Sequence, residues 1–252
     1  MIGFPSLIEF NSVEENIEFG IKYNFNFLEL NLNLPYVQEY LLSNKLPDNR
    51  LKYTLHFFDE ADFGLYDEVS EAYISLLDKY LFNSSKYIRQ VNIHLNVGPI
   101  VTVSGNKNYI YNIYYDDYIK RLESNLSKLA RVCDKYNVGL VIENILSLDF
   151  ICKTFKLLSN NYKFTYDYGH DMTSGASLYD YFINNLGLFN EVHFHDSTHE
   201  QCHLALGKGN AIVDKTYNLI KDKIEYILLE VKSSEDLITS LEFLKNMKKE
   251  VL

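Results

Sequence analysis

Six side chains of the kinds that bind metal ions stand in or at the end of short apolar runs in this chain. The runs read YTLH, VNIH, LVIE, FTYD, EVHFH and YILLE, and they carry His56, His94, Glu143, Asp167, His193 and Glu230. If the runs are parallel strands of a closed barrel, their C-terminal ends meet at one face. Three carboxylates and three imidazoles brought together without a cation would repel one another and lose hydration. The pattern therefore predicts a divalent metal site.

The elements that would position these residues alternate along the chain. Apolar, β-rich runs recur at about residues 2–8, 27–32, 52–57, 90–95, 138–143, 163–167, 190–195 and 226–231. Stretches with helical periodicity lie between them, such as 13–23, 68–84, 114–136 and 234–248. This alternation is typical of right-handed parallel βαβ units. The length of 252 residues matches a (β/α)₈ TIM barrel, which usually has about 250 residues.

A doubly wound open sheet is the competing α/β fold. It would need a Gly-rich phosphate turn after the first strand. The first run instead leads into Phe10-Asn11-Ser12, which is typical of a helix N-cap. No low-complexity linker divides the sequence, so we expect residues 1–252 to form a single barrel domain.

The composition argues against some classes of function. A formal net charge of −10 is unlike the basic stripe of a broad nucleic-acid surface. No apolar run approaches the roughly 20 residues that a membrane helix needs, and the N-terminus lacks the features of a signal peptide. We therefore expect a cytoplasmic protein without a membrane partner. Its three cysteines, Cys133, Cys152 and Cys202, are expected to stay reduced.

Four residues form the core of the predicted site. Asp167 follows Glu143 by 24 residues, His193 follows after another 26, and Glu230 after 37 more. Each step spans about one βα unit, so the four can line one rim of a barrel. Carboxylate oxygens with a single imidazole suit Zn²⁺, Mn²⁺, Mg²⁺ or Fe²⁺, and the mixture does not choose among them.

Further candidates surround this core. His170 lies three residues after Asp167, and His203 precedes a Gly-rich turn at 205–209 that can present backbone N–H groups to an anion. His195 and Asp196 extend the seventh strand, where they are expected to hold substrate hydroxyls or orient metal ligands. The long connections at 58–67 and 96–112 are candidates for a lid or a substrate loop.

Several motifs resemble one known family. They are VIEN (141–144), DYGH (167–170), HFHDS (193–197), HLALGKGN (203–210) and LLE (228–230). Nearly the whole chain resembles the xylose-isomerase-like TIM-barrel superfamily, which includes sugar and sugar-phosphate isomerases and epimerases and endonuclease IV-type apurinic endonucleases. The resemblance implies that Glu143, Asp167, His193 and Glu230 hold a shared metal ion.

The resemblance leaves two activities open. A sugar enzyme would hold one ion, with Glu143 and Glu230 as its acid–base pair and His170 as a further catalytic residue. His170, His56, His94 and His203 would orient substrate hydroxyls or a phosphate. An endonuclease would hold up to three ions, adding His56, His94, His170 and His203 as ligands and taking DNA as its partner. The endonuclease pattern has an Asp two residues before its last His, where this chain has Gln201.

The acidic charge, Gln201 and the scarcity of Arg favour the sugar or sugar-phosphate enzyme, with the apurinic endonuclease as the alternative. A barrel that binds metal or sugar without turnover is a third possibility. The number of ions, from one to three, and the formation of a homo-oligomer stay open.

Overall fold

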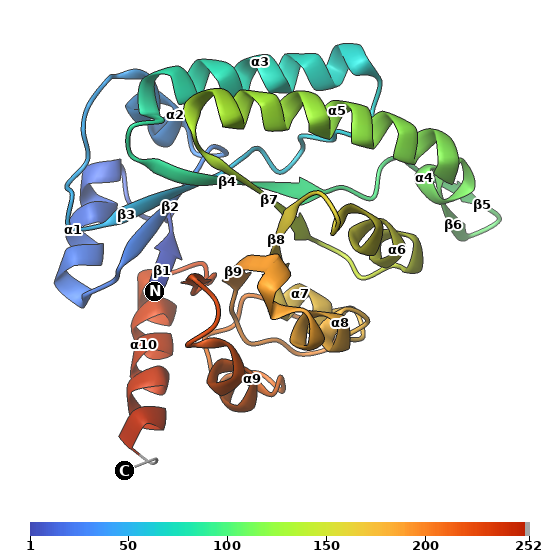
Figure 1. Cartoon of the computed structure of the whole chain (residues 1–252). Coiled ribbons are helices and arrows are strands. Elements are labelled where there is room, and N and C mark those ends of the chain that lie inside the picture. Colours follow the sequence, from blue (N-terminus) through green and yellow to red (C-terminus); the bar gives the residue numbers. More distant parts are fainter. Residues whose placement is uncertain (250–252) are drawn as a thin grey trace.

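A closed barrel of parallel strands lies at the centre of the structure, a computed structural model that describes residues 1–249 (Figure 1). The strands are β1 (Ile2–Pro5), β2 (Phe27–Asn31), β3 (Lys52–His56), β4 (Ile88–Leu95), β7 (Gly139–Asn144), β8 (Lys163–Asp167), β9 (Phe189–His193) and β10 (Tyr226–Leu228). They pair in the order β1-β10-β9-β8-β7-β4-β3-β2 and close on themselves. The predicted (β/α)₈ barrel is confirmed, and the open doubly wound sheet is excluded.

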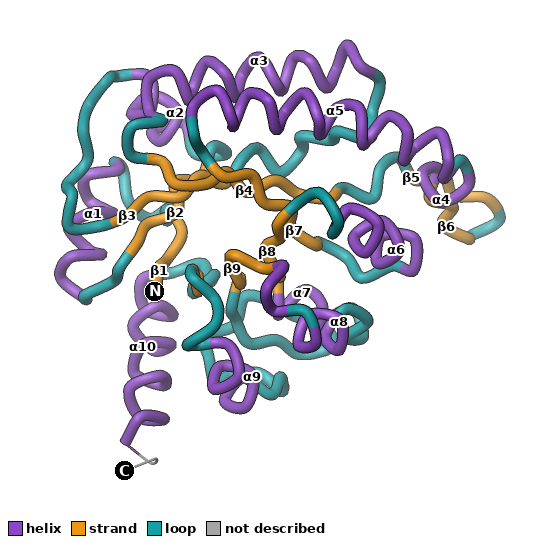
Figure 2. Tube along the Cα trace, viewed as in Figure 1, coloured by secondary structure: helices purple, strands orange, loops and turns teal. Residues whose placement is uncertain are grey.

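The helices surround this barrel, as Figure 2 shows by colour. They are α1 (Val13–Tyr23), α2 (Pro35–Leu42), α3 (Asp67–Ser84), α4 (Ile110–Ile113), α5 (Tyr115–Tyr136), α6 (Asp149–Leu158), α7 (Tyr168–Thr173), α8 (Tyr179–Asn184), the 3₁₀ turn η1 (Leu186–Leu188), α9 (Val213–Ile220) and α10 (Ser234–Lys249). The Ser12 side chain caps α1 as predicted, by accepting the N–H of Glu15. None of the helices in residues 1–249 is long and apolar enough to cross a membrane.

Alternation along the strands separates an outer apolar layer from the barrel interior. On β2, Leu28 and Leu30 join the main hydrophobic core, while Phe27 packs with Tyr226 and Leu228 in a separate cluster. The next inward position on β2 is Glu29, which is 1% exposed. Buried polar side chains from several strands accompany it: Thr54, Gln90, Asn92, Thr165 and Glu191. A polar layer therefore lies inside the barrel.

Several strands end earlier than the apolar runs suggest. The β9 strand ends at His193, so His195 lies beyond it, and β10 ends at Leu228, so Glu230 lies two residues past its strand. The first strand is also shorter than its run, ending at Pro5. The side chains of the site thus come from both strand ends and the loops that follow.

The two long connections pack against each other. The amide of Asn96 donates to the carbonyl of Ala61 over 2.9 Å, and the hydroxyl of Tyr111 donates to Asp62 over 2.8 Å. The second connection also holds an exposed hairpin of β5 (Ile100–Val103) and β6 (Asn106–Tyr109). These contacts fix the base of both connections beside the C-terminal ends of β3 and β4.

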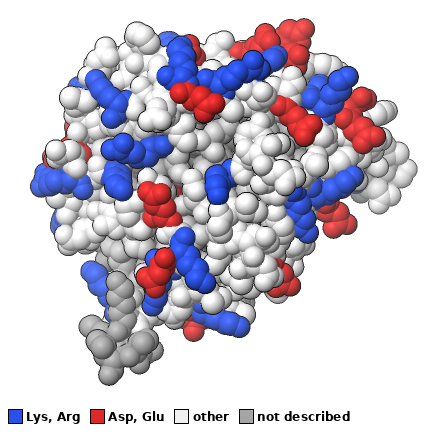
Figure 3. Space-filling view, in the orientation of Figure 1, with Lys and Arg blue, Asp and Glu red and all other residues white. Residues whose placement is uncertain are grey.

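Charged side chains of both signs are interspersed on the face seen in Figure 3. No continuous basic tract runs across that face. This agrees with the net charge of −10.

Candidate metal centre

Potential ligand atoms of Glu143, Asp167, His193 and Glu230 lie within 4.8 Å of one another. Nδ1 of His193 is 3.0 Å from Oε1 of Glu143 and 3.4 Å from Oε2 of Glu230. Three buried atoms, Oδ2 of Asp167, Nδ1 of His193 and Oε2 of Glu230, have no hydrogen-bond partner among residues 1–249. Buried polar atoms are seldom left unpaired. Their convergence in one place fits a divalent cation, and the donor set suits one.

The electrostatics of this tetrad are those of a cation site. Burial alone would raise the pKa of Glu143, but the neighbouring imidazoles of His193 and His94 hold it well below 4.5. Burial likewise opposes ionisation of Glu230, and His193 and His203 lower its pKa. Burial lowers the pKa of His193, yet the surrounding carboxylates outweigh it and raise that pKa well above 6.5. The carboxylates around His193 thus favour a positive charge at this position, which is the electrostatic requirement of a cation site.

His56 and His94 form a second group with Glu143. Their Nε2 atoms lie 3.4 Å and 3.6 Å from Oε2 of Glu143. Nδ1 of His56 is 2.8 Å from the carbonyl oxygen of Phe57, so the ring donates a proton there and directs Nε2 at Glu143. The hydrogen bond that fixes the opposite nitrogen is typical of a histidine that ligates metal.

Asp167 is held from several sides. Asn144, the last residue of VIEN, accepts the Asp167 N–H over 2.9 Å and donates to the Asp167 carbonyl over 3.0 Å. Oδ1 of Asp167 accepts the N–H of His170 over 2.7 Å and lies 3.1 Å from Nε2 of His195. Only Oδ2 is left for a cation.

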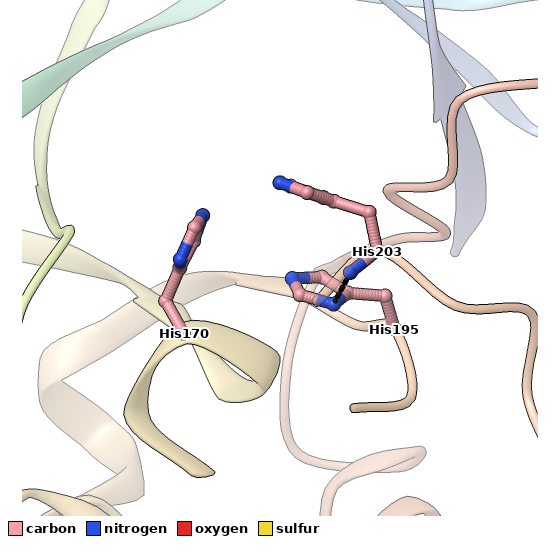
Figure 4. Close-up of side chains that lie close together, drawn as sticks. All are labelled: His170, His195 and His203. Carbon is pink, nitrogen blue, oxygen red and sulfur yellow. Dashed lines mark hydrogen bonds between the residues drawn. The ribbon is translucent and has the colours of Figure 1, made fainter. Parts of the chain in front are cut away.

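His195 uses both ring nitrogens within the protein. Its Nδ1 accepts the backbone N–H of His203 over 2.8 Å, the dashed line in Figure 4. The ring proton is therefore on Nε2 and points to Asp167. Close packing fixes the ring further, because a Cβ on Gly169 would lie 2.0 Å from it. Of the two roles expected for His195, this geometry supports orienting a metal ligand over holding a substrate hydroxyl.

Asp196 is turned away from the tetrad. Its carboxylate accepts the backbone N–H groups of Ser197, Gly207, Gly209 and Ala211 at 2.8 to 3.1 Å. The Gly-rich turn does present N–H groups to an anion, as expected, but that anion is the Asp196 side chain. Gly209 is required there, since a Cβ would come within 2.4 Å of the carboxylate. This environment supports a role in holding the loop over contact with substrate.

The rings of His170 and His203 lie nearly perpendicular to each other (Figure 4), with ring centroids 4.9 Å apart. Nδ1 of His203 is 2.9 Å from the Glu230 carbonyl oxygen, which leaves its Nε2 directed into the site. His203 also adopts a left-handed backbone, with φ of 57°, which is uncommon for a residue with a Cβ. Together with His195, these two residues form a group of possible ligands. Both ring nitrogens of His195 are engaged, so His170 and His203 are the members of this group that can offer a nitrogen to a metal ion.

Gln201, the departure from the endonuclease pattern, lies in the same loop as His203. Gln201 is exposed, and its side chain makes no hydrogen bond with the part of the chain that the structure describes. Cys202 is half-buried, and burial raises the pKa of its thiol, which disfavours the thiolate that binds metal. His199 is exposed. Position 201 thus supplies no carboxylate to the third ion of the endonuclease pattern.

Some residues of the site were not predicted from the sequence. Glu29, Asn92 and Glu191 are buried in the barrel interior, and Asn92 donates to Oε2 of Glu143. The sequence could have indicated that Glu29 points into the barrel, because this charged residue stands between two leucines in the strand FLELN. Asn92 and Glu191 also stand in the runs that carry His94 and His193, where polar residues at alternate positions indicate an inward face.

A hollow of about 210 Å³ is lined by Glu230 of the tetrad, together with residues that include Ser6, Asn31, Asp59 and Lys232. It is smaller than the roughly 300–1,000 Å³ of drug-sized ligand pockets, and it suits a small polar molecule. A larger hollow of about 730 Å³ lies between residues 46–53 and the start of β4. None of the predicted site residues lines it.

Comparisons with known proteins point to one family. The family model described as Xylose isomerase-like TIM barrel matches residues 86–247. No curated protein matches the chain.

Solved structures share the whole fold. A D-tagatose 3-epimerase-like protein is 20% identical, with a TM-score of 0.77 over 99% of this chain and 97% of that one. L-ribulose 3-epimerase is 18% identical, with a TM-score of 0.64 over 93% and 82%. The IolI protein with a bound zinc atom is 12% identical, with a TM-score of 0.70 over 100% and 99%.

Proposed function

The chain belongs to the xylose isomerase-like TIM barrel family, and from this premise we propose that it is a divalent-metal-dependent isomerase or epimerase of a sugar or sugar phosphate. One observation carries the proposal. Unpaired buried atoms of Asp167, His193 and Glu230 converge beside Glu143, next to a hollow that suits a small polar molecule. The similarity to sugar epimerases in fold supports the substrate class.

The tetrad supplies both metal ligands and proton carriers in this proposal. A bound divalent ion would act as a Lewis acid for the negative charge that develops on the substrate oxygens. Neighbouring imidazoles hold the pKa of Glu143 and of Glu230 low, so both carboxylates are ionised at neutral pH. One of them removes the proton from the carbon beside the carbonyl. The other takes up a proton from solvent and delivers it to that carbon, and the first then releases the removed proton to solvent. Such acid–base catalysis typically contributes about 10²–10⁴-fold in rate.

The histidines around the tetrad orient the substrate. Nε2 of His203 faces the site, because its Nδ1 is held by the Glu230 carbonyl. His170 is partly exposed, with 24% of its side chain accessible. We assign these two residues to substrate hydroxyls or a phosphate, with His170 as a further proposed catalytic residue.

An apurinic endonuclease is the second candidate, and one observation favours it. Ligand atoms of His56, His94 and Glu143 lie within 4.8 Å of one another, so a second ion can share Glu143 with the first. Two adjacent ions would suit in-line attack on a phosphodiester. The exposed Gln201 and the engaged nitrogens of His195 weigh against the third ion.

The two candidates are separated by parallel assays of one preparation. The protein is loaded with Zn²⁺ or Mn²⁺ and incubated with a panel of ketoses and ketose phosphates, and products are resolved by chromatography. The same sample is tested for nicking of DNA that holds an abasic site. We expect epimer or isomer formation that Glu143→Gln abolishes. Nicking that depends on Glu143, without any sugar product, would establish the endonuclease instead.

A further inference from the structure

Glu29 is a carboxylate buried inside the barrel, within 4.8 Å of possible ligand atoms of His56 and His193. It is 1% exposed, and its only ion-pair contact within residues 1–249 is to His193. Its second oxygen lies 3.5 Å from the hydroxyl of Thr54, at the limit of a hydrogen bond. A buried carboxylate that lacks a close hydrogen-bond partner destabilises a fold. Such a residue calls for a functional explanation.

Glu29 faces the nitrogen of His193 that the tetrad does not use. Nδ1 of His193 is directed at Glu143 and Glu230, whereas Nε2 lies 3.6 Å from Oε1 of Glu29. That separation is longer than a hydrogen bond, about 2.7–3.2 Å, so in the metal-free protein the contact is electrostatic. A carboxylate beside Nε2 stabilises a proton on that nitrogen.

The ring can bind metal through Nδ1 only if its proton is on Nε2. We propose that Glu29 is a positioning residue of the metal centre, whose carboxylate holds the Nε2 proton of His193 and keeps the Nδ1 lone pair directed at the ion. This inference rests on the proposed metal site at the tetrad. It adds a fifth residue, from β2, on the side of His193 opposite to the ligands.

Other neighbours of Nε2 are less suited to this role. The amide nitrogen of Asn92 lies 3.5 Å away, but that group donates to Glu143 and cannot accept a proton. Oε1 of Glu191 is 4.0 Å away, and the other oxygen of Glu191 accepts the amide of Gln90. Glu29 is therefore the nearest acceptor, and Glu191 offers a matched buried control on a different strand.

The test measures metal affinity together with metal-free stability. Zn²⁺ and Mn²⁺ affinities are determined by competition with a chromophoric chelator for the wild type, Glu29→Gln and Glu191→Gln. Loss of a carboxylate partner of a ligating histidine typically weakens metal binding about 10–100-fold, and we expect that for Glu29→Gln. The melting temperature of each metal-free variant is measured alongside, so that a loss of folding is distinguished from a loss of metal affinity. Glu191→Gln should change the affinity less than about threefold, given the longer distance.

Several outcomes overturn the inference. Equal metal affinities for Glu29→Gln and wild type would show that Glu29 has no positioning role. Equal losses of affinity in Glu29→Gln and Glu191→Gln would show that any carboxylate in the barrel interior has the same effect. A lower melting temperature for metal-free Glu29→Gln with unchanged affinity would make Glu29 structural. A wild type that binds neither ion would contradict the proposed function itself, which keeps the two failures apart.

A spectroscopic readout covers the case in which Glu29→Gln does not fold. Glu29→Asp keeps the charge, and ¹⁵N imidazole spectra of the metal-loaded wild type and of this variant report which nitrogen of His193 carries the proton. The expected result is a proton on Nε2 in both, with an intermediate metal affinity for Glu29→Asp. A proton on Nδ1, or none on either nitrogen, would overturn the proposal.

Discussion

Nε2 of His195 donates to Oδ1 of Asp167 over 3.1 Å, while Oδ2 of the same carboxylate has no partner among the described residues. The two oxygens of Asp167 thus have different tasks, one held by the protein and one available to a cation. This relationship makes His195 part of the support of the metal centre. It also ties the loop after β9 to the end of β8.

Replacing His195 should weaken metal binding without abolishing folding. We expect His195→Asn to lower the affinity for Zn²⁺ or Mn²⁺ by about 10-fold or more, since Asp167 loses the donor that fixes its orientation. Chelator competition measures the effect. His199→Ala serves as the control, because His199 is an exposed histidine of the same loop.

The contact between His195 and Asp167 can also be disturbed through Gly169, which packs against the His195 ring. A Cβ on Gly169 would lie 2.0 Å from the His195 ring, so Gly169→Ala must displace that ring. We expect a loss of metal affinity close to that of His195→Asn, and a double variant no weaker than either single one, because both act through one contact. Additive losses would show that Gly169 and His195 act independently.

Stability of the metal-free protein should fall as the pH rises from 6.5 toward 9. Burial lowers the pKa of His56, but Glu143 and Glu29 outweigh it and raise the pKa to about 10; the pKa of His193 is also raised. A histidine whose pKa is higher in the folded state than in the unfolded state adds to the stability of the fold. This contribution is complete at a pH below the unfolded-state pKa, near 6.5, and is lost as the pH rises through the folded-state pKa. Each kcal/mol lost lowers the melting temperature of a chain this size by about 2–4 °C.

Thermal unfolding in a chelator at pH 6.5, 7.5, 8.5 and 9 checks this expectation. The metal-loaded protein should vary less over the same range, because its ligating histidines are already deprotonated. A melting temperature of the metal-free protein that stays level or increases from pH 6.5 to 9 would contradict the assigned charges.

Asp196 should matter for stability more than for chemistry. Asp196→Asn leaves a single acceptor oxygen for the four backbone N–H groups that the carboxylate now binds. Hydrogen bonds to a charged group contribute about 1.5–3 kcal/mol each, so the free energy of unfolding should drop by at least that amount. Denaturant unfolding measures the loss. Asp214→Asn is the control, since Asp214 is exposed in the first turn of α9, and equal midpoints for the two variants would refute the role of Asp196.

The sequence was sufficient for the barrel and for the convergence of its ligands. Regular alternation of β-rich runs and helical stretches predicts the fold, and a ligand in or just after a strand run predicts its position at one rim. The surroundings of individual side chains were harder to predict, because they depend on contacts between segments that are distant in the sequence. Asp196 looked available to substrate until the fold placed four N–H groups around it, and Glu29 gained its meaning only when β2 came to lie opposite His193.

The number of bound ions distinguishes the two enzyme types. We expect elemental analysis of the purified protein to find about one tightly bound divalent ion per chain, in the tetrad, since divalent ions are held best where carboxylates and imidazole converge. Glu230→Gln should lose that ion, whereas His203→Ala should keep it. A ratio near three, reduced by His203→Ala, would favour the endonuclease arrangement.

Exchange of a single carbon-bound proton with solvent tests the central claim most directly. The metal-loaded protein is incubated in D₂O with the panel of ketoses and ketose phosphates, and ¹H NMR follows the proton on the carbon next to the carbonyl. The account predicts loss of that signal for at least one sugar, abolished by Glu143→Gln and by Glu230→Gln. Retention of the signal across the whole panel, with metal bound, would contradict the proposed sugar chemistry.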